Sequence, residues 1–374
     1  MSHEELRDRI LGCVVGATIG DAIGGAFEFQ DADFVRERIG TDWIDDMYPY
    51  KNVLPAPHYI WTMDAPAGTG TDDTRYNHIF IETVLRHGKG ITSRDLAGAL
   101  IERYDAREKY YPGAGEMAHR QFADWNGVCC GHLGRECPLH PGVPPEALAN
   151  TGLRMDFPTL VGMLMLASAG MLHVGDPEQA YRHAYLLDFM DIGYAREAVG
   201  LFAALVSVLS GGKELRPAID EAIRLNPFEL GGTFGGPTMI ENLPRAKTLA
   251  RGSKDDRDLV QNLAHAFASR HPLDPVEHVS VAVASLYFTR GDAKRSILIA
   301  ANHRIIDERG DLVRFRDNDC TAYFAGALAG SHCGLSALPP EWVEKVVDSN
   351  RKLYGIDLIG NAEKLCEMVT KSNE

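Results

Sequence analysis

Four glycines recur at every fourth position near the start of the chain, and they constrain the fold more than any other feature. Gly12, Gly16, Gly20 and Gly24 lie within an apolar segment over 6–27. A four-residue spacing places them on one helix face, where the missing side chains let another backbone approach closely. Each glycine costs a helix about 1 kcal/mol relative to alanine. Because tight packing must offset that cost, the sequence predicts a buried central helix here.

Helical spacing of apolar residues dominates the rest of the chain. Thr71 is the expected N-cap of a helix over Thr71–His87, since acidic residues fill the first turn. Strand signals are weak, with one small hairpin expected over 304–315. The fold class that follows is all-α, a compact bundle of many helices. Further helices are expected over 93–106, 158–173, 176–189, 194–210, 214–225, 256–269, 275–290, 292–302, 320–330 and 340–353.

Two irregular segments interrupt this pattern. Residues 107–150 are rich in Gly, Pro and Cys, and residues 227–245 contain a run of glycines. Long loops in compact helical proteins are usually lids or binding loops, or are disordered. We expect a single domain over 1–374 with loop inserts at 107–150 and 227–245.

The charge balance and the cysteines narrow the class of protein. The chain has 38 Lys plus Arg against 52 Asp plus Glu, a net charge of −14. This argues against nucleic acid as a partner. An odd count of seven scattered cysteines is typical of reduced thiols. The N-terminus is acidic, unlike a signal peptide, and Asp21 interrupts the apolar segment that follows. We expect a cytoplasmic enzyme with no membrane partner.

Two acidic clusters stand at the starts of predicted helices, Asp72-Asp73 and Asp317-Asn318-Asp319. A helix N-terminus stabilises one charge by only about 0.3–1 kcal/mol. If the clusters converge, their carboxylates must bind cations or take up protons. Oxygen ligands favour Mg²⁺, Mn²⁺ or Ca²⁺ over Zn²⁺. The alternative is that each pair is an ordinary solvated cap. Glu28, between two phenylalanines, is either an exposed loop acid or a functional one.

Three motifs together resemble the ADP-ribosylglycohydrolases, which include the dinitrogenase reductase activating glycohydrolases and the ADP-ribosyl-acceptor hydrolases. They are GATIGDAIGGAFE ending at Glu28, TDDT at 71–74, and RDNDCTAYFAGALAG from Arg316 onward. Their order, spacing and helical context match over about 3–330. The resemblance implies an all-α ADP-ribosylglycohydrolase-like bundle with a binuclear centre of two divalent cations, Mg²⁺ or Mn²⁺.

The resemblance also implies roles by position. Glu28 matches a mobile acid beside the metals, and Glu28 or Asp73 is expected to take a proton from a water molecule. The implied metal ligands are Thr71, Asp72, Asp73, Asp317, Asp319 and Cys320.

Three positions depart from the family pattern. Cys320 stands where the family usually has a Thr ligand, and a neutral thiol suits Mg²⁺ poorly. Either water takes that place or the site accepts softer Mn²⁺. Arg316 replaces a Gly and is expected to bring a cation to the rim. The family's Thr-His motif is not obvious, and its counterpart is expected at Met190–Tyr194.

Substrate contacts are expected in the loops. Asn150, Gly152 and Arg154 partly resemble the family's substrate loop. Tyr194, Phe234 and the glycines of 231–236 are candidates for contacts with the base or the diphosphate. Asp191, within the expected counterpart of the Thr-His motif, is a further candidate for substrate binding. For each of these residues the alternative is ordinary loop packing.

A separate metal site is possible in the first insert. Cys130, His132, Cys137 and His140 together offer four ligands for structural Zn²⁺. The spacing is compact and matches no known zinc finger. The alternative is a Gly- and Pro-rich loop with free thiols.

The expected function is metal-dependent hydrolysis of a glycosidic bond in an ADP-ribosyl or related ribosyl substrate. The partner would be a small molecule or an ADP-ribosylated protein. The alternatives are a hydrolase of small nucleoside-like N-glycosides, and a non-catalytic family member that binds ADP-ribose or is structural. The sequence leaves the leaving group, the stereochemistry and the oligomeric state open.

Overall fold

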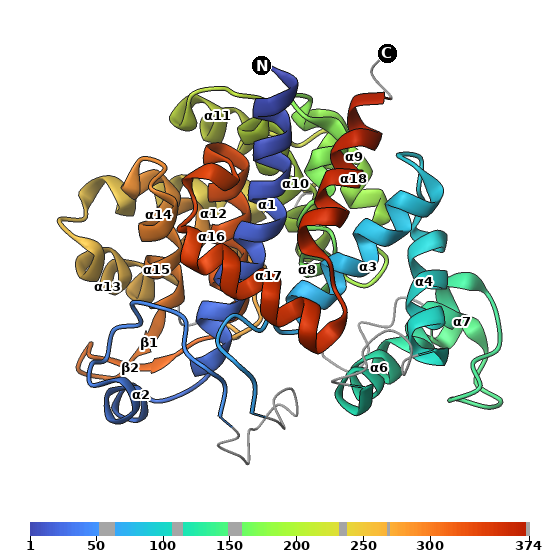
Figure 1. Cartoon of the computed structure of the whole chain (residues 1–374), viewed down its shortest axis with the longest axis horizontal. Coiled ribbons are helices and arrows are strands. Elements are labelled where there is room, and N and C mark those ends of the chain that lie inside the picture. The colour runs from blue at the N-terminus through green and yellow to red at the C-terminus, as the bar shows by residue number, and fades with distance from the viewer. Residues whose placement is uncertain (52–63, 107–114, 149–158, 232–237, 268–269, 372–374) are drawn as a thin grey trace.

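The structure is a computed structural model of the 374-residue chain, and it describes residues 1–51, 64–106, 115–148, 159–231, 238–267 and 270–371. Helices dominate these residues, as Figure 1 shows. The strands β1 (Arg304–Ile306) and β2 (Leu312–Phe315) pair as one small antiparallel sheet. The all-α fold class and the hairpin are therefore confirmed.

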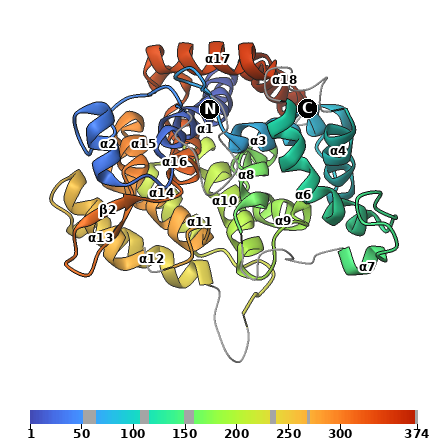
Figure 2. The same ribbon diagram turned by 90° about the horizontal axis from the view of Figure 1, so that it is seen from below.

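The helices pack in several layers around α1. Figure 2 shows α13 with the β hairpin at one end of the molecule, and α6 with α7 at the other. The α-helices are α1 (His3–Gly24), α2 (Ala32–Ile39), α3 (Asp72–His87), α4 (Ser93–Asp105), α6 (Gly115–Leu133), α7 (Pro145–Leu148), α8 (Val161–Met165), α9 (Pro177–Leu187), α10 (Tyr194–Ser210), α11 (Leu215–Ala222), α12 (Thr238–Gly252), α13 (Asp256–Phe267), α14 (Pro275–Thr289), α15 (Ala293–Ala301), α16 (Asn318–Cys333), α17 (Pro340–Tyr354) and α18 (Leu358–Lys371). Short 3₁₀ turns are η1 (Gly25–Phe27), η2 (Ala169–His173) and η3 (Leu335–Ala337).

The glycine stripe of α1 packs directly on the backbone of α16. A Cβ atom on Gly12 would lie 2.5 Å from the carbonyl oxygen of Gly330, and one on Gly16 would lie 2.5 Å from that of Gly326. Gly24 faces the backbone of Asn318 in the same way. The two helices therefore run antiparallel, and the end of α1 meets the start of α16. The predicted central helix is confirmed. By length and composition the segment His3–Phe27 passes as a membrane span, yet its most apolar window is wholly buried inside the fold.

The start of α3 is held between α1 and α17. Asn350 accepts a hydrogen bond from the Gly70 N–H at 3.1 Å and donates one to the Gly68 carbonyl at 2.9 Å. The Tyr354 hydroxyl donates to the Gly70 carbonyl at 2.7 Å. Through these bonds α17 sets the position of the chain just before α3.

The helix expected over 158–173 is broken into α8 and η2. Asn77 of α3 donates to the Met165 carbonyl and to the Ser168 hydroxyl, each at 3.0 Å. At Gly170 a Cβ atom would clash with the backbone of α10. These long-range contacts replace the hydrogen bonds of a continuous helix. The apolar pattern of the segment does not reveal this break.

Several helices were not expected. They are α2, α6, α7, α12 and α18. Of these, α6 and α7 lie within 107–150, and α12 begins within 227–245, so neither insert is a loop throughout. Pro244 stands inside α12 and obscures its helical pattern. The single domain over 1–374 stays a prediction.

Candidate metal centre

A buried carboxylate from α1 organises the first turn of α3. Asp21 is fully buried and accepts hydrogen bonds from the Thr71 N–H at 2.8 Å and the Thr74 N–H at 3.2 Å. It also accepts one from the Thr74 hydroxyl at 2.5 Å. Burial and the charge of Asp319 raise the pKa of Asp21 to about 7. Asp21 has no expected role from the sequence, although a charge inside an apolar, glycine-rich helix is a usable signal of one.

The two acidic clusters meet at one place. Glu28, Asp317 and Asp319 each offer a ligand atom, and these atoms lie within 4.8 Å of one another. The same holds for Asp73, Asp319 and Cys320. Asp319 belongs to both groups. Three elements converge here, because Glu28 follows η1, Asp73 begins α3, and the other three residues stand at the start of α16.

Three oxygens in these groups are buried without a hydrogen-bond partner. They are Asp73 Oδ2, Asp317 Oδ2 and Asp319 Oδ1. His278 Nε2 lies 4.0 Å from Asp317 Oδ2, but it donates to the Pro272 carbonyl at 2.7 Å. Buried polar atoms in native proteins normally have partners. Carboxylate oxygens left open in this way suit divalent cations, so the donor set fits the metals that the sequence implied.

The pKa values of the clustered acids also indicate a site for cations. Burial, followed by the charges of neighbouring carboxylates, raises the pKa values of Glu28, Asp73 and Asp317 well above their ordinary range. Without cations these acids would therefore take up protons. The thiol of Cys320 donates to Asp73 Oδ1 at 3.6 Å.

Arg316 does not supply the missing positive charge. The sequence placed it at the rim, but its side chain is buried and turned toward α14. Its Nε and Nη2 atoms each lie 2.7 Å from a carboxylate oxygen of Glu277. His303 Nε2 bonds the same carboxylate at 2.8 Å. Burial alone would raise the pKa of Glu277, but these bonds outweigh it and hold that pKa at about 2. The expectation of a rim cation at Arg316 is wrong, because a carboxylate already neutralises it.

Thr71 and Asp72 border the two groups. The buried Thr71 caps α3 by accepting the Asp73 N–H at 3.2 Å, and its hydroxyl also bonds the Asp319 carboxylate. Asp72 is more exposed and outside both groups. Its charge still contributes to the raised pKa values of Glu28 and Asp73, so it lies near the cluster. Ligand roles for these two residues stay predictions.

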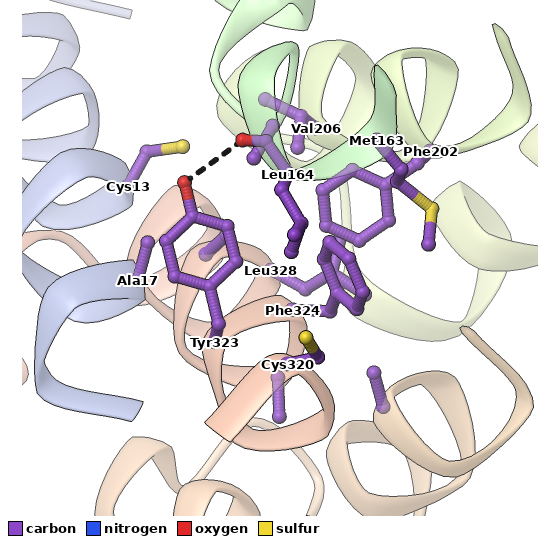
Figure 3. Packing of buried hydrophobic residues seen from close by; sticks show 14 of the residues in the cluster. Cys13, Ala17, Met163, Leu164, Phe202, Val206, Cys320, Tyr323, Phe324 and Leu328 are labelled. Carbon is purple, nitrogen blue, oxygen red and sulfur yellow. Dashed lines mark hydrogen bonds between the residues drawn. The ribbon is translucent and has the colours of Figure 1, made fainter. Parts of the chain in front are cut away.

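An apolar cluster lies behind the carboxylates. Figure 3 shows side chains of α1, α8, α10 and α16 packed together, with Cys320 at the edge of the group. The Tyr323 hydroxyl donates to the Leu164 carbonyl at 3.2 Å and ties α16 to α8. This packing excludes water from one side of the acids and strengthens the electrostatic effects described above.

The predicted substrate residues divide into two sets. Asn150, Gly152, Arg154 and Phe234 lie outside the described residues. Asp191 accepts hydrogen bonds from the Thr159 hydroxyl at 2.5 Å and the Gly162 N–H at 2.8 Å, so it caps α8. The Tyr194 hydroxyl donates to Asp274 at 2.8 Å. Both side chains thus have protein partners, and their substrate roles stay predictions.

The candidate zinc residues have other partners. His132 Nε2 lies 3.0 Å from the Ser93 hydroxyl, and its ring stacks on Phe189 with 4.5 Å between the ring centres. Cys130 and Cys137 both donate to Asn126 Oδ1, at 3.6 and 3.3 Å. Across the described ranges, Cys130, His132, Cys137 and His140 do not form a set of three donors within 4.8 Å. The structure does not gather them into a zinc-binding set.

The chain is similar to known proteins in both sequence and structure. The sequence model of the ADP-ribosylglycohydrolase family matches residues 2–373. ADP-ribosylarginine hydrolase Tri1 of Pseudomonas putida (strain GB-1) is 24% identical over 353 residues, which are 92% of this chain and 76% of that protein. A solved structure described as an ADP-ribosylglycohydrolase-related protein complex has a TM-score of 0.58 at 18% identity, covering 98% of this chain and 99% of that one. The similarity to the solved structure shows the fold. The family model matches nearly the full length, and it shows that the chain belongs to the ADP-ribosylglycohydrolase family of glycoside hydrolases.

Proposed function

We propose that the chain hydrolyses the glycosidic bond between an ADP-ribosyl group and its acceptor, using two divalent cations. Family membership supports the glycohydrolase activity. One observation carries the metal dependence. Two groups of buried or partly buried donors share Asp319, and open carboxylate oxygens occur in both groups.

Charge balance supports two cations rather than one. Glu28, Asp72, Asp73, Asp317 and Asp319 bring up to five negative charges to one place. Two divalent cations supply four positive charges, which makes the crowding of the carboxylates tolerable. Glu28, Asp317 and Asp319 would hold one cation, and Asp73, Asp319 and Cys320 the other, with Asp319 between them. Thr71 and Asp72 would complete the ligand set.

The chemistry follows from this arrangement. Glycosidic cleavage passes through an oxocarbenium-like transition state. The bound cations would orient vicinal ribose hydroxyls and lower the pKa of water. Glu28 is the more accessible acid of its group and is placed to accept a proton from the attacking water, with Asp73 as the second candidate.

The turn that carries Glu28 is held in place. Phe29 has a left-handed backbone with φ of 55°, which is costly for a residue with a side chain. Its N–H donates to the Arg316 carbonyl at 3.1 Å, next to the Asp317 ligand. This bond ties the turn just after Glu28 to the chain before α16.

Product analysis tests the proposal. The full chain is incubated with ADP-ribosyl-arginine, ADP-ribosyl-serine and a panel of nucleosides, with and without Mg²⁺ or Mn²⁺. We expect release of ADP-ribose from an ADP-ribosyl substrate only with metal, and loss of about two orders of magnitude in rate for Asp319→Asn. Asp33→Asn, which removes an exposed carboxylate of α2, should keep the rate. A folded chain that binds metal yet releases no sugar from any substrate would refute the proposal.

The nucleoside panel addresses the second candidate function. Asp191 stands where the family's Thr-His motif is expected, and its carboxylate is engaged with α8. The family's Thr-His contact with the substrate is therefore changed at this position, and this change favours a smaller N-glycoside as the substrate over an ADP-ribosyl group. Release of ribose from a nucleoside, with no product from either ADP-ribosyl substrate, would select that function.

A further inference from the structure

We infer that the two metal positions differ in chemistry, and that Cys320 makes one of them selective for thiophilic cations such as Co²⁺ or Zn²⁺. This inference rests on the proposed function, because it concerns the same centre. It assigns an oxygen-only position to a hard cation such as Mg²⁺, and a mixed sulfur and oxygen position to the softer one.

The two donor groups already differ in composition. Glu28, Asp317 and Asp319 offer carboxylate oxygens only. The second group replaces one carboxylate with the thiol of Cys320. Hard cations such as Mg²⁺ favour oxygen, whereas thiolate ligands select softer metals. Because the two groups share Asp319 but differ in their other donors, the two cation positions have different ligand chemistry.

The distance between Cys320 and Asp73 allows both residues to bind one and the same cation. Cys320 Sγ lies 3.6 Å from Asp73 Oδ1. A cation about 2.3 Å from a thiolate sulfur and about 2.1 Å from a carboxylate oxygen, at a tetrahedral angle, requires a sulfur–oxygen separation of about 3.6 Å. The thiol and the carboxylate therefore need no rearrangement to bind the same thiophilic cation.

The second group also contains open oxygens. Asp73 Oδ2 and Asp319 Oδ1 are buried and have no hydrogen-bond partner. The thiol donates its proton to the other oxygen of Asp73 and also lies within hydrogen-bonding reach of the Asp317 carboxylate. Both oxygens stay without a partner, and the residues that carry them share a donor group with Cys320. When a cation binds, the S–H bond breaks, a sulfur–metal bond forms and the proton passes to solvent.

Cobalt reports on sulfur ligation directly. Metal-free full-length protein is titrated with Co²⁺ while the near-ultraviolet thiolate-to-cobalt charge-transfer band and the visible d–d bands are recorded. We expect both in the wild type. Cys320→Ser and Cys320→Thr should lose the charge-transfer band and keep visible bands, since oxygen ligands remain. Cys137→Ser is the matched control, because Cys137 is also buried and donates to Asn126 instead of an acid.

The outcomes separate the alternatives. Visible bands without a charge-transfer band in the wild type would overturn the inference, as would a band that survives in Cys320→Ser. A band lost in Cys137→Ser instead would place the thiolate in the 107–150 insert and also overturn it. Thermal melting of each variant shows whether it is folded, and Cys320→Ser keeps the size of the side chain closest to the original.

Calorimetry measures the selectivity. We expect excess Mg²⁺ to displace Co²⁺ from one of the two positions only, and Cys320→Thr to weaken Zn²⁺ binding by about tenfold or more while changing Mg²⁺ binding little. Equal displacement from both positions would contradict the inference. Glycosidase assays are run in parallel. A sulfur band without sugar release would leave this inference standing and reject the proposed function alone.

Discussion

At the scale of single residues, Asp21 and Glu277 show how carboxylates outside the proposed ligand set organise the candidate centre. Asp21 accepts the Thr71 and Thr74 N–H groups and so places Asp73 against α16. Glu277 binds Arg316 and thereby keeps its charge from the neighbouring Asp317. Each acts through a hydrogen bond to the chain beside a proposed ligand, so each is a positioning residue.

Replacing Asp21 tests the first of these roles. Asp21→Asn turns one acceptor into a donor that faces N–H and O–H groups. We expect a loss of about 1–3 kcal/mol in unfolding free energy, because buried donors become unsatisfied. Mn²⁺ affinity, measured by calorimetry, should fall as well. Unchanged Mn²⁺ affinity in a destabilised Asp21→Asn protein would limit Asp21 to a structural role.

The pKa of Glu277 predicts a pH dependence of stability. Its folded pKa is about 2, against 4.5 in an unstructured chain. A lowered carboxylate pKa stabilises the fold above pH 4.5, and the benefit is lost as the pH falls toward 2. The full effect is at most about 3.5 kcal/mol.

Glu277→Gln isolates this effect. Urea unfolding of the two proteins from pH 7 downward should give a difference in unfolding free energy that is largest at neutral pH and narrows below pH 4.5. A difference that stays constant with pH would show that the ionisation of Glu277 contributes nothing.

At the scale of elements, the antiparallel pair α1 and α16 determines where the site forms. Its register places Gly24 beside Asn318, so the last turn of α1 meets the first turn of α16. Glu28 comes from one helix end, and Asp317 and Asp319 come from the other. α17 secures the third side through Asn350 and Tyr354.

Gly16→Ala tests this pair. Its Cβ atom would lie 2.5 Å from the Gly326 carbonyl oxygen, so the helices must separate. We expect a loss of about 1–3 kcal/mol or more in unfolding free energy, measured by urea titration. Gly98→Ala is the control, because Gly98 lies within α4 and its Cβ atom meets nothing within 4 Å. That change should stabilise the protein by about 0.5–1 kcal/mol. A stabilising Gly16→Ala would refute the close packing.

At the scale of the whole molecule, folding brings carboxylates from distant parts of the chain together. The repulsion between these carboxylates lowers the stability of the fold, and bound cations would offset it. The motifs at 28, 72–73 and 317–319 span most of the sequence, so metal binding should stabilise the entire fold rather than one loop.

Metal addition measures this coupling. Mg²⁺ or Mn²⁺ at 100 times its dissociation constant should stabilise the chain by about 2.7 kcal/mol for each site. The melting temperature should rise with metal and return after chelation with EDTA. Asp319→Asn should lose most of this rise, since Asp319 belongs to both groups. Identical melting curves with metal and with chelator would contradict a metal centre.

Features that depend on local chemistry were predictable. Thr71 was recognised as the cap of α3 because capping involves neighbouring residues, and its side chain does accept the Asp73 N–H. The break between α8 and η2 was not, because its cause is Asn77, far away in the sequence. The burial of Arg316 against Glu277 was missed for the same reason. No local pattern encodes the partner of a buried charge.

By itself the sequence determined the all-α class, the central glycine helix and the acids that would gather, since periodicity, spacing and capping are properties of short segments. Only the tertiary structure decided that the acids share one place, that Asp21 organises them and that Cys320 joins the donor group of Asp73 and Asp319. Those facts depend on the register between α1 and α16 and on hydrogen bonds between residues tens to hundreds of positions apart. Such pairings arise from packing in three dimensions, which the order of residues specifies only through the complete fold.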